Sequence, residues 1–144
     1  AAQPGVRLGR EAAARLKRLR EPVQLSVFVT PVCPYSASMA SVALEMALAD
    51  AQVRVEVVEI SEYPELVKRF GVTATPTTVI DGRLVLRGEV DADALAGYVL
   101  ASTEPSAMVR TIDAGPLTPF TGASIGKQAA AASPAAPRIY VPGR

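Results

Sequence analysis

Two apolar runs separated by a helix-length segment constrain the fold of this chain more than any other feature of its sequence. Val23 to Thr30 (VQLSVFVT) is nearly continuous in hydrophobicity and rich in β-branched residues, which is typical of a strand buried on both faces. Val53 to Ile60 (VRVEVVEI) predicts a second strand, and Pro34 to Asp50 between them predicts a helix. Strands that alternate with helices indicate an α/β fold.

Weaker signals complete the order of elements as α-β-α-β-α-β-β-α. They predict, in chain order, an amphipathic helix, a short helix, a hairpin and a last helix. Their bounds are Gly9 to Arg20, Glu62 to Phe70, Thr77 to Arg87 around an Asp81-Gly82 turn, and Asp91 to about Ser102. Pro22 ends the first helix, Gly71 can be the left-handed cap of the second, and Asp91 can cap the last.

The 144 residues fit one compact domain with a segment left over at each end. We expect an N-terminal amphipathic helix in residues 1–21, a domain in residues 22–102, and a Pro/Ala/Gly-rich C-terminal extension in residues 103–144. The composition of the extension predicts a flexible tail. Its few large apolar residues lie in PLTPF and RIYVPGR, which alternatively could dock on the domain or on a partner.

The absence of histidine excludes most familiar catalytic sites. Neither a Ser-His-Asp nor a Cys-His pair can form, and no imidazole is present to bind a metal. A single cysteine also excludes an internal disulfide and a zinc site made of several thiolates, so we expect no metal. Cys33 is therefore either a buried filler or a free thiol with a function.

Charge and hydropathy exclude two further classes of protein. The net charge is +1, and six of the 15 basic residues lie in residues 1–20, which leaves an acidic body with 5% aromatic residues in the whole chain, so we expect no nucleic-acid partner. No apolar run approaches the ~18 residues of a membrane-spanning helix. Basic residues interrupt the N-terminal segment, which argues against a signal peptide, and we expect a cytoplasmic protein that binds no membrane.

Cys33 lies where the first buried strand leads into the long helix, in the string TPVCPYS. A thiol just before a first helical turn faces unpaired backbone N–H groups and the positive end of the helix dipole, both of which favour the thiolate. An inert, buried cysteine is the alternative. We favour a reactive thiol, because a strand-to-helix junction flanked by Pro31 and Pro34 is a poor place for a core filler.

The string TPVCPYS resembles the TP-x-CPYC active site of glutaredoxin-like protein disulfide oxidoreductases in the thioredoxin superfamily, which carry two such domains in tandem. The stretch VEVVEISEYPELVKRFGVTATPTTVIDG resembles the same group, and the likeness covers about residues 10–102. It implies a thioredoxin fold with a mixed four-stranded sheet flanked by helices. It also implies that Cys33 is the nucleophile and that Pro34 and Tyr35 belong to the substrate-binding site, where they shape the backbone around the sulfur and shade it.

Thr75-Pro76 matches the second hallmark of this superfamily, a cis-proline that faces the cysteine. A cis X-Pro bond turns the backbone so that residue 75 can present its N–H and C=O to an extended substrate. The resemblance therefore implies that Thr75 and Pro76 bind substrate.

Ser36 departs from the pattern, because the dithiol enzymes use a second cysteine there to release the substrate and a hydroxyl cannot do so. Three interpretations fit this serine. We favour an engineered Cys→Ser substitution in a CPYC enzyme, since the surroundings match the dithiol string closely. The others are a natural monothiol enzyme, whose mixed disulfide an outside thiol resolves, and a thioredoxin-like binding module without turnover.

The resemblance also implies partners for the reaction. They are a disulfide-bearing protein substrate and either a flavin-linked reductase or glutathione as co-substrate, with no bound cofactor.

The roles of three further residues, Glu59 and the pair Gly88 and Asp91, can each be explained in two ways. Glu59 is either a proton acceptor or a solvated strand end, and Gly88 with Asp91 either binds glutathione or forms a turn and a helix cap.

Overall fold

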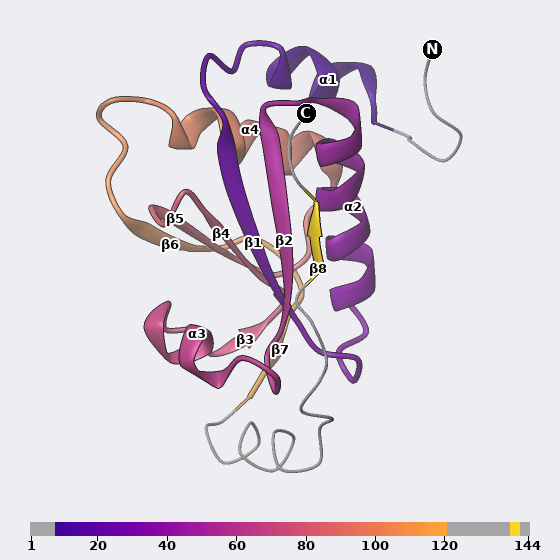
Figure 1. Cartoon of the computed structure of the whole chain (residues 1–144), viewed down its shortest axis with the longest axis vertical. Helices are drawn as coiled ribbons and strands as arrows, with labels where there is room; N and C mark the ends of the chain where they lie inside the picture. Colours follow the sequence, from indigo (N-terminus) through magenta and orange to yellow (C-terminus); the bar gives the residue numbers. More distant parts are fainter. Residues whose placement is uncertain (1–7, 121–138, 142–144) are drawn as a thin grey trace.

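The computed structural model describes residues 8–120 and 139–141 of the chain, and Figure 1 shows their arrangement. The helices are α1 (Arg10–Leu16), α2 (Ser36–Ala49), α3 (Pro64–Arg69) and α4 (Ala92–Ser102). The strands are β1 (Val23–Val29), β2 (Val53–Glu59), β3 (Ala74–Thr75), β4 (Thr77–Ile80), β5 (Leu84–Arg87), β6 (Arg110–Asp113), β7 (Thr118–Pro119) and β8 (Ile139–Val141). All the elements predicted from the sequence are present, in the predicted order.

The main sheet is mixed and has the strand order β6-β5-β4-β1-β2-β8. Its centre is the predicted four-stranded sheet, in which β1 runs parallel to β2 and antiparallel to β4. The β4–β5 hairpin turns at Asp81 and Gly82, whose φ angles of 51° and 66° are those of a tight type I′ turn. Helices flank this sheet, so the predicted thioredoxin fold is confirmed.

The sheet has an apolar core on each face. On one face, side chains of β1 such as Leu25 and Val27 pack with α1, α2 and α4 in the larger cluster. On the other face, Phe28 packs with Val58 and Val67 in a smaller cluster beneath α3. Adjacent side chains of β1 point to opposite faces, so Val27 enters the larger core and Phe28 the smaller one, and this end of the strand is apolar on both faces.

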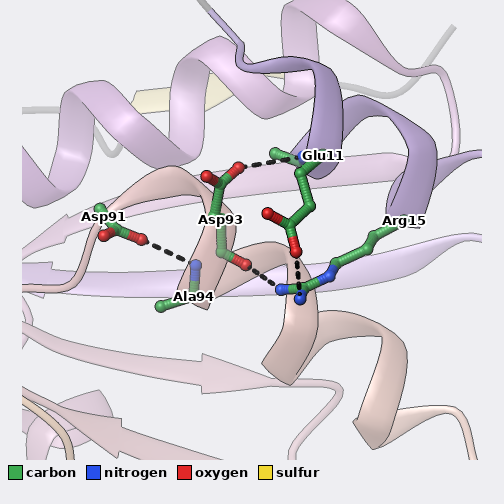
Figure 2. A network of polar contacts seen from close by, with 6 residues as sticks. Glu11, Arg15, Asp91, Asp93 and Ala94 are labelled. Carbon is green, nitrogen blue, oxygen red and sulfur yellow. Dashed lines mark hydrogen bonds and ion pairs between the residues drawn. The ribbon is translucent and has the colours of Figure 1, made fainter.

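The N-terminal helix α1 is held against α4 by a group of polar contacts that Figure 2 shows from close by. Oδ1 of Asp93 accepts a hydrogen bond from the Ala12 N–H at 3.0 Å, and the Asp93 carbonyl accepts one from Arg15 at 2.6 Å. Asp91 caps α4 as predicted, because its Oδ1 accepts from the Ala94 N–H at 2.8 Å. Leu16, only 1% exposed, anchors α1 in the larger core.

The C-terminal extension is not the flexible tail that its composition suggested, over the parts that the structure describes. β6 pairs in parallel with β5, β7 pairs with β3, and β8 pairs with β2. The alternative expectation, that these two segments dock on the domain, therefore describes residues 118–119 within PLTPF and 139–141 within RIYVPGR. The physical reason is that β5, β3 and β2 each present an open edge whose backbone groups need partners. Residues 1–7, 121–138 and 142–144 lie outside the described residues.

Across residues 8–120 and 139–141, no helix is long and apolar enough to cross a membrane.

Candidate active site

Cys33 lies in the turn between β1 and α2. Its N–H donates to the Thr30 carbonyl at 3.2 Å, and its own carbonyl accepts from the Ser36 N–H at 3.4 Å. The helix begins at Ser36 with Tyr35 as its N-cap, so the prediction that Pro34 opens the helix is wrong by two residues. Pro34 and Tyr35 instead lie in the turn that leads from Cys33 to the helix.

The structure brings Cys33 and Thr75 together although 42 positions separate them. The Cys33 thiol donates a hydrogen bond to the Thr75 carbonyl, with Sγ and the oxygen 3.4 Å apart. The Thr75-Pro76 peptide bond is cis, as predicted. Thr75 is fully buried, and Cys33 is 5% exposed. The two motifs identified in the sequence therefore meet at one place.

Ser36 holds this turn in shape. Its side chain is buried, and its Oγ accepts a hydrogen bond from the Thr30 N–H at 3.3 Å. The same side chain is the foremost of the hydrogen-bonding groups that lower the pKa of Cys33. Because a hydroxyl can accept one hydrogen bond and donate another, Ser36 can hold the end of β1 and also donate to a Cys33 thiolate. The serine thus fits its site well, whichever residue is native there.

The pKa of Cys33 is lowered to about 7 from an ordinary value of 9.0. Burial raises the pKa, and hydrogen bonds from Ser36, Thr118 and Thr75 and from the Tyr35 backbone lower it by more. The Thr75 hydroxyl has no partner while Cys33 carries its proton, so it is free to donate to a thiolate. Among the groups that lower this pKa, the three hydroxyl side chains come before the Tyr35 backbone at the start of α2.

Sequence reasoning missed Thr118. This residue comes from the extension and lies opposite Thr75 in the β3–β7 pairing. Its side chain is one of the hydrogen-bonding groups that lower the pKa of Cys33. The signal was present in the sequence, because PLTPF is one of the two segments of the extension that contain large apolar residues, but nothing in it indicated where the segment docks.

A cavity of about 290 Å³ adjoins the sulfur, and its lining includes Cys33, Ser36 and Glu59. Glu59 is not a free strand end. Its Oε2 accepts the N–H groups of Ser61 at 3.0 Å and Glu62 at 3.1 Å, and also the Ser61 hydroxyl. The carboxylate therefore stabilises the turn after β2, and only its position in the cavity wall relates it to Cys33.

Gly88 and Asp91 have structural roles that account for both residues. Gly88 has a φ of +104°, and a Cβ there would lie 2.2 Å from the Gly115 carbonyl oxygen. Asp91 is occupied in capping α4. Within the described part of the chain, no group of three or more His, Cys, Asp or Glu side chains could hold a metal ion.

Comparison with known proteins shows which family this chain belongs to. A thioredoxin domain profile matches residues 23–99, which is more than half of the chain. The thioredoxin of Methanocaldococcus jannaschii is 33% identical over 75 residues, which make up 51% of this chain and 87% of that protein. The chain belongs to the thioredoxin domain family. This thioredoxin domain includes both Cys33 and Thr75-Pro76, and family membership supports thiol–disulfide oxidoreductase chemistry at a general level.

Two solved structures share the thioredoxin fold. The NTD N/C domain of alkylhydroperoxide reductase AhpF from Enterococcus faecalis has a TM-score of 0.60 and 22% identity, over 68% of this chain and 45% of that one. A cysteine-to-alanine mutant of the AhpF subunit from the same organism has a TM-score of 0.60 and 23% identity, over the same shares of the two chains. The chain thus matches less than half the length of either, and the likeness concerns the fold alone.

Proposed function

We propose that this thioredoxin domain exchanges thiols and disulfides through Cys33. The observation that carries the proposal is the meeting of a thiol of lowered pKa with the backbone of Thr75. With a pKa of about 7, about half of the thiol is ionised at neutral pH, and the thiolate is the nucleophile in disulfide exchange.

In the first step, the Cys33 thiolate attacks one sulfur of a substrate disulfide. The substrate S–S bond breaks, a new S–S bond joins Cys33 to the substrate, and the second substrate sulfur leaves as a thiolate. The hydroxyls of Ser36, Thr118 and Thr75 stabilise the attacking thiolate as hydrogen-bond donors. An extended substrate strand pairs with Thr75 during this step, so that its disulfide meets the sulfur.

In the second step, another thiolate attacks the mixed disulfide at the Cys33–substrate bond and regenerates Cys33. Ser36 cannot supply that thiolate, so this chain needs an outside thiol, such as glutathione or a protein thiol. The outside thiol becomes bonded to the substrate sulfur, which keeps the electrons balanced. In a form with cysteine at position 36, that residue would resolve the bond and a flavin-linked reductase could return the electrons.

We favour a Cys→Ser variant of a CPYC enzyme as the origin of Ser36, with a natural monothiol enzyme as the second interpretation. The proposed substrate is a disulfide-bearing protein, and the proposed location is the cytoplasm, whose thiol pool would resolve a monothiol intermediate. The described site needs no metal or organic cofactor for either step.

The test is to incubate the reduced chain with glutathione disulfide and with a disulfide-bearing peptide, and to weigh the products by mass spectrometry. One covalent adduct per chain supports the proposal, and Cys33→Ala is the blank because Cys33 is the only cysteine. Restoring Ser36→Cys should allow catalytic reduction of insulin. No adduct, together with no turnover in the folded Ser36→Cys variant, would favour an interaction module instead.

A further inference from the structure

The backbone edge beside Cys33 is already occupied by a strand of the same chain. β7 pairs antiparallel with β3, with Thr118 opposite Thr75 and Pro119 opposite Ala74. In the described residues, β7 is the strand that β3 pairs with, in a separate two-stranded sheet. The Thr118 side chain is also one of the hydrogen-bonding groups that lower the pKa of Cys33. In its pairing with Thr75 beside the reacting sulfur, the segment resembles a bound extended peptide.

Contacts on both sides of β7 hold it there. Before it, the Pro116 carbonyl accepts a hydrogen bond from the Glu89 N–H at 2.9 Å. After it, the Phe120 N–H donates to the Thr73 carbonyl at 3.0 Å, and the Phe120 ring packs on the smaller core. The segment is therefore anchored by backbone pairing and by the partly buried Phe120 ring.

The fit at the start of this segment depends on two glycines. A Cβ on Gly115 would lie 1.8 Å from the Glu89 carbonyl oxygen, and a Cβ on Gly88 would lie 2.2 Å from the Gly115 carbonyl oxygen. Both clashes are with backbone atoms, which cannot rotate away. Only glycine allows the extension to approach this closely, so a side chain at position 115 would push the segment off the domain.

We propose that residues 115–120 form an intramolecular strap that fills the substrate-strand position and must leave before a protein disulfide can react. This inference rests on the proposed function and adds a regulatory device to the same site. Two strands cannot pair with one edge of Thr75 at once, so an incoming peptide competes with β7. The rate of reaction with an extended substrate is then the rate for the open site multiplied by the fraction of time that the strap is released.

Two substitutions in the full-length chain open the strap without touching Cys33, Ser36 or Thr75. Gly115→Val introduces the backbone clash, and Phe120→Ala removes the anchor in the smaller core. Met108→Ala is the matched control in the same extension, because Met108 is 77% exposed. Far-ultraviolet circular dichroism and a cooperative thermal transition establish that each variant is folded.

The measurement is the rate of mixed-disulfide formation between Cys33 and a disulfide-bearing peptide, divided by the rate of alkylation with iodoacetamide. The small reagent needs no strand pairing, so this ratio cancels any change in the thiol pKa. The strap predicts a ratio raised on the order of tenfold or more in Gly115→Val and Phe120→Ala, and unchanged in Met108→Ala.

An unchanged or lower ratio in both folded variants would overturn the strap while leaving the proposed function standing, because adducts would still form. No adduct in any variant would refute the proposed function and the strap together. If only Phe120→Ala failed to fold, Gly115→Val alone would decide, since that clash lies outside the smaller core.

Discussion

Sγ of Cys33 lies 3.4 Å from the carbonyl oxygen of Thr75, and the thiol donates its proton toward that oxygen. The carbonyl can accept this hydrogen bond only from the protonated sulfur. When the thiol ionises, the hydroxyls of Ser36, Thr118 and Thr75 take over as donors. The same few atoms thus accommodate both protonation states of the nucleophile.

Ser36→Ala should raise the pKa of Cys33. Burial raises this pKa already, and the Ser36 hydroxyl is the foremost of the hydrogen bonds that oppose it. Losing a hydrogen bond to a charged group corresponds to a rise on the order of one unit. The measurement is the pH dependence of Cys33 alkylation. Ser36→Thr, which keeps the hydroxyl, is the control, and equal pH profiles for the Ala and Thr variants would contradict this role.

The reduced protein should become more stable as pH rises from 7 to 9, relative to Cys33→Ser. The folded thiol has the lower pKa, so in this range the unfolded state binds the extra proton and stability increases with pH. A shift from 9.0 to about 7 corresponds to about 2 to 3 kcal/mol, present in full above pH 9 and absent below pH 7. Urea unfolding at several pH values measures it, and parallel curves for the two proteins would count against the lowered pKa.

Leu16→Ala should cost about 2 to 5 kcal/mol of unfolding free energy, because Leu16 is 1% exposed and its removal leaves a cavity between α1 and the sheet. Leu48→Ala in α2 is the control, since Leu48 is 40% exposed and should cost far less. Denaturant titration of both variants checks this. A loss no larger than that of Leu48→Ala would mean that α1 is not an integral part of the fold.

Asp93→Ala should loosen α1 by a smaller amount. Asp93 accepts a backbone hydrogen bond from Ala12 at 3.0 Å, and removing the carboxylate leaves that N–H at the start of α1 without its partner. The expected cost is about 1 kcal/mol. Glu11→Ala is the comparison, because its ion pair with Arg15 is largely exposed and should contribute little. Equal losses for the two variants would argue against this polar anchor.

The central elements could be predicted because their signals are local. The apolar runs at Val23 and Val53 predicted strands, and Gly71, with a φ of 65°, is the left-handed helix cap that its position suggested. Cys33 and Thr75-Pro76 could be paired only through the resemblance to a known family. Nothing in their spacing alone states that a loop and a strand 42 positions apart meet.

The extension could not be predicted in the same way, because composition reports what a segment contains and not which edge will receive it. Proline and glycine between residues 104 and 120 suggested flexibility, yet Gly115 is there to allow close backbone approach to Glu89. Likewise, Thr118 resembles any surface threonine in the sequence. Its role at the sulfur depends on the register of β7 against β3, which is a tertiary property.

The most direct test of a prepared nucleophile is the pKa of Cys33 in the reduced 144-residue chain, followed by ultraviolet thiolate absorbance as pH is varied. Cys33→Ser supplies the baseline, because no other thiol is present. We expect a transition at about pH 7. A transition at pH 9 or above would contradict it, since the sulfur would then be an ordinary thiol with no preparation for disulfide exchange.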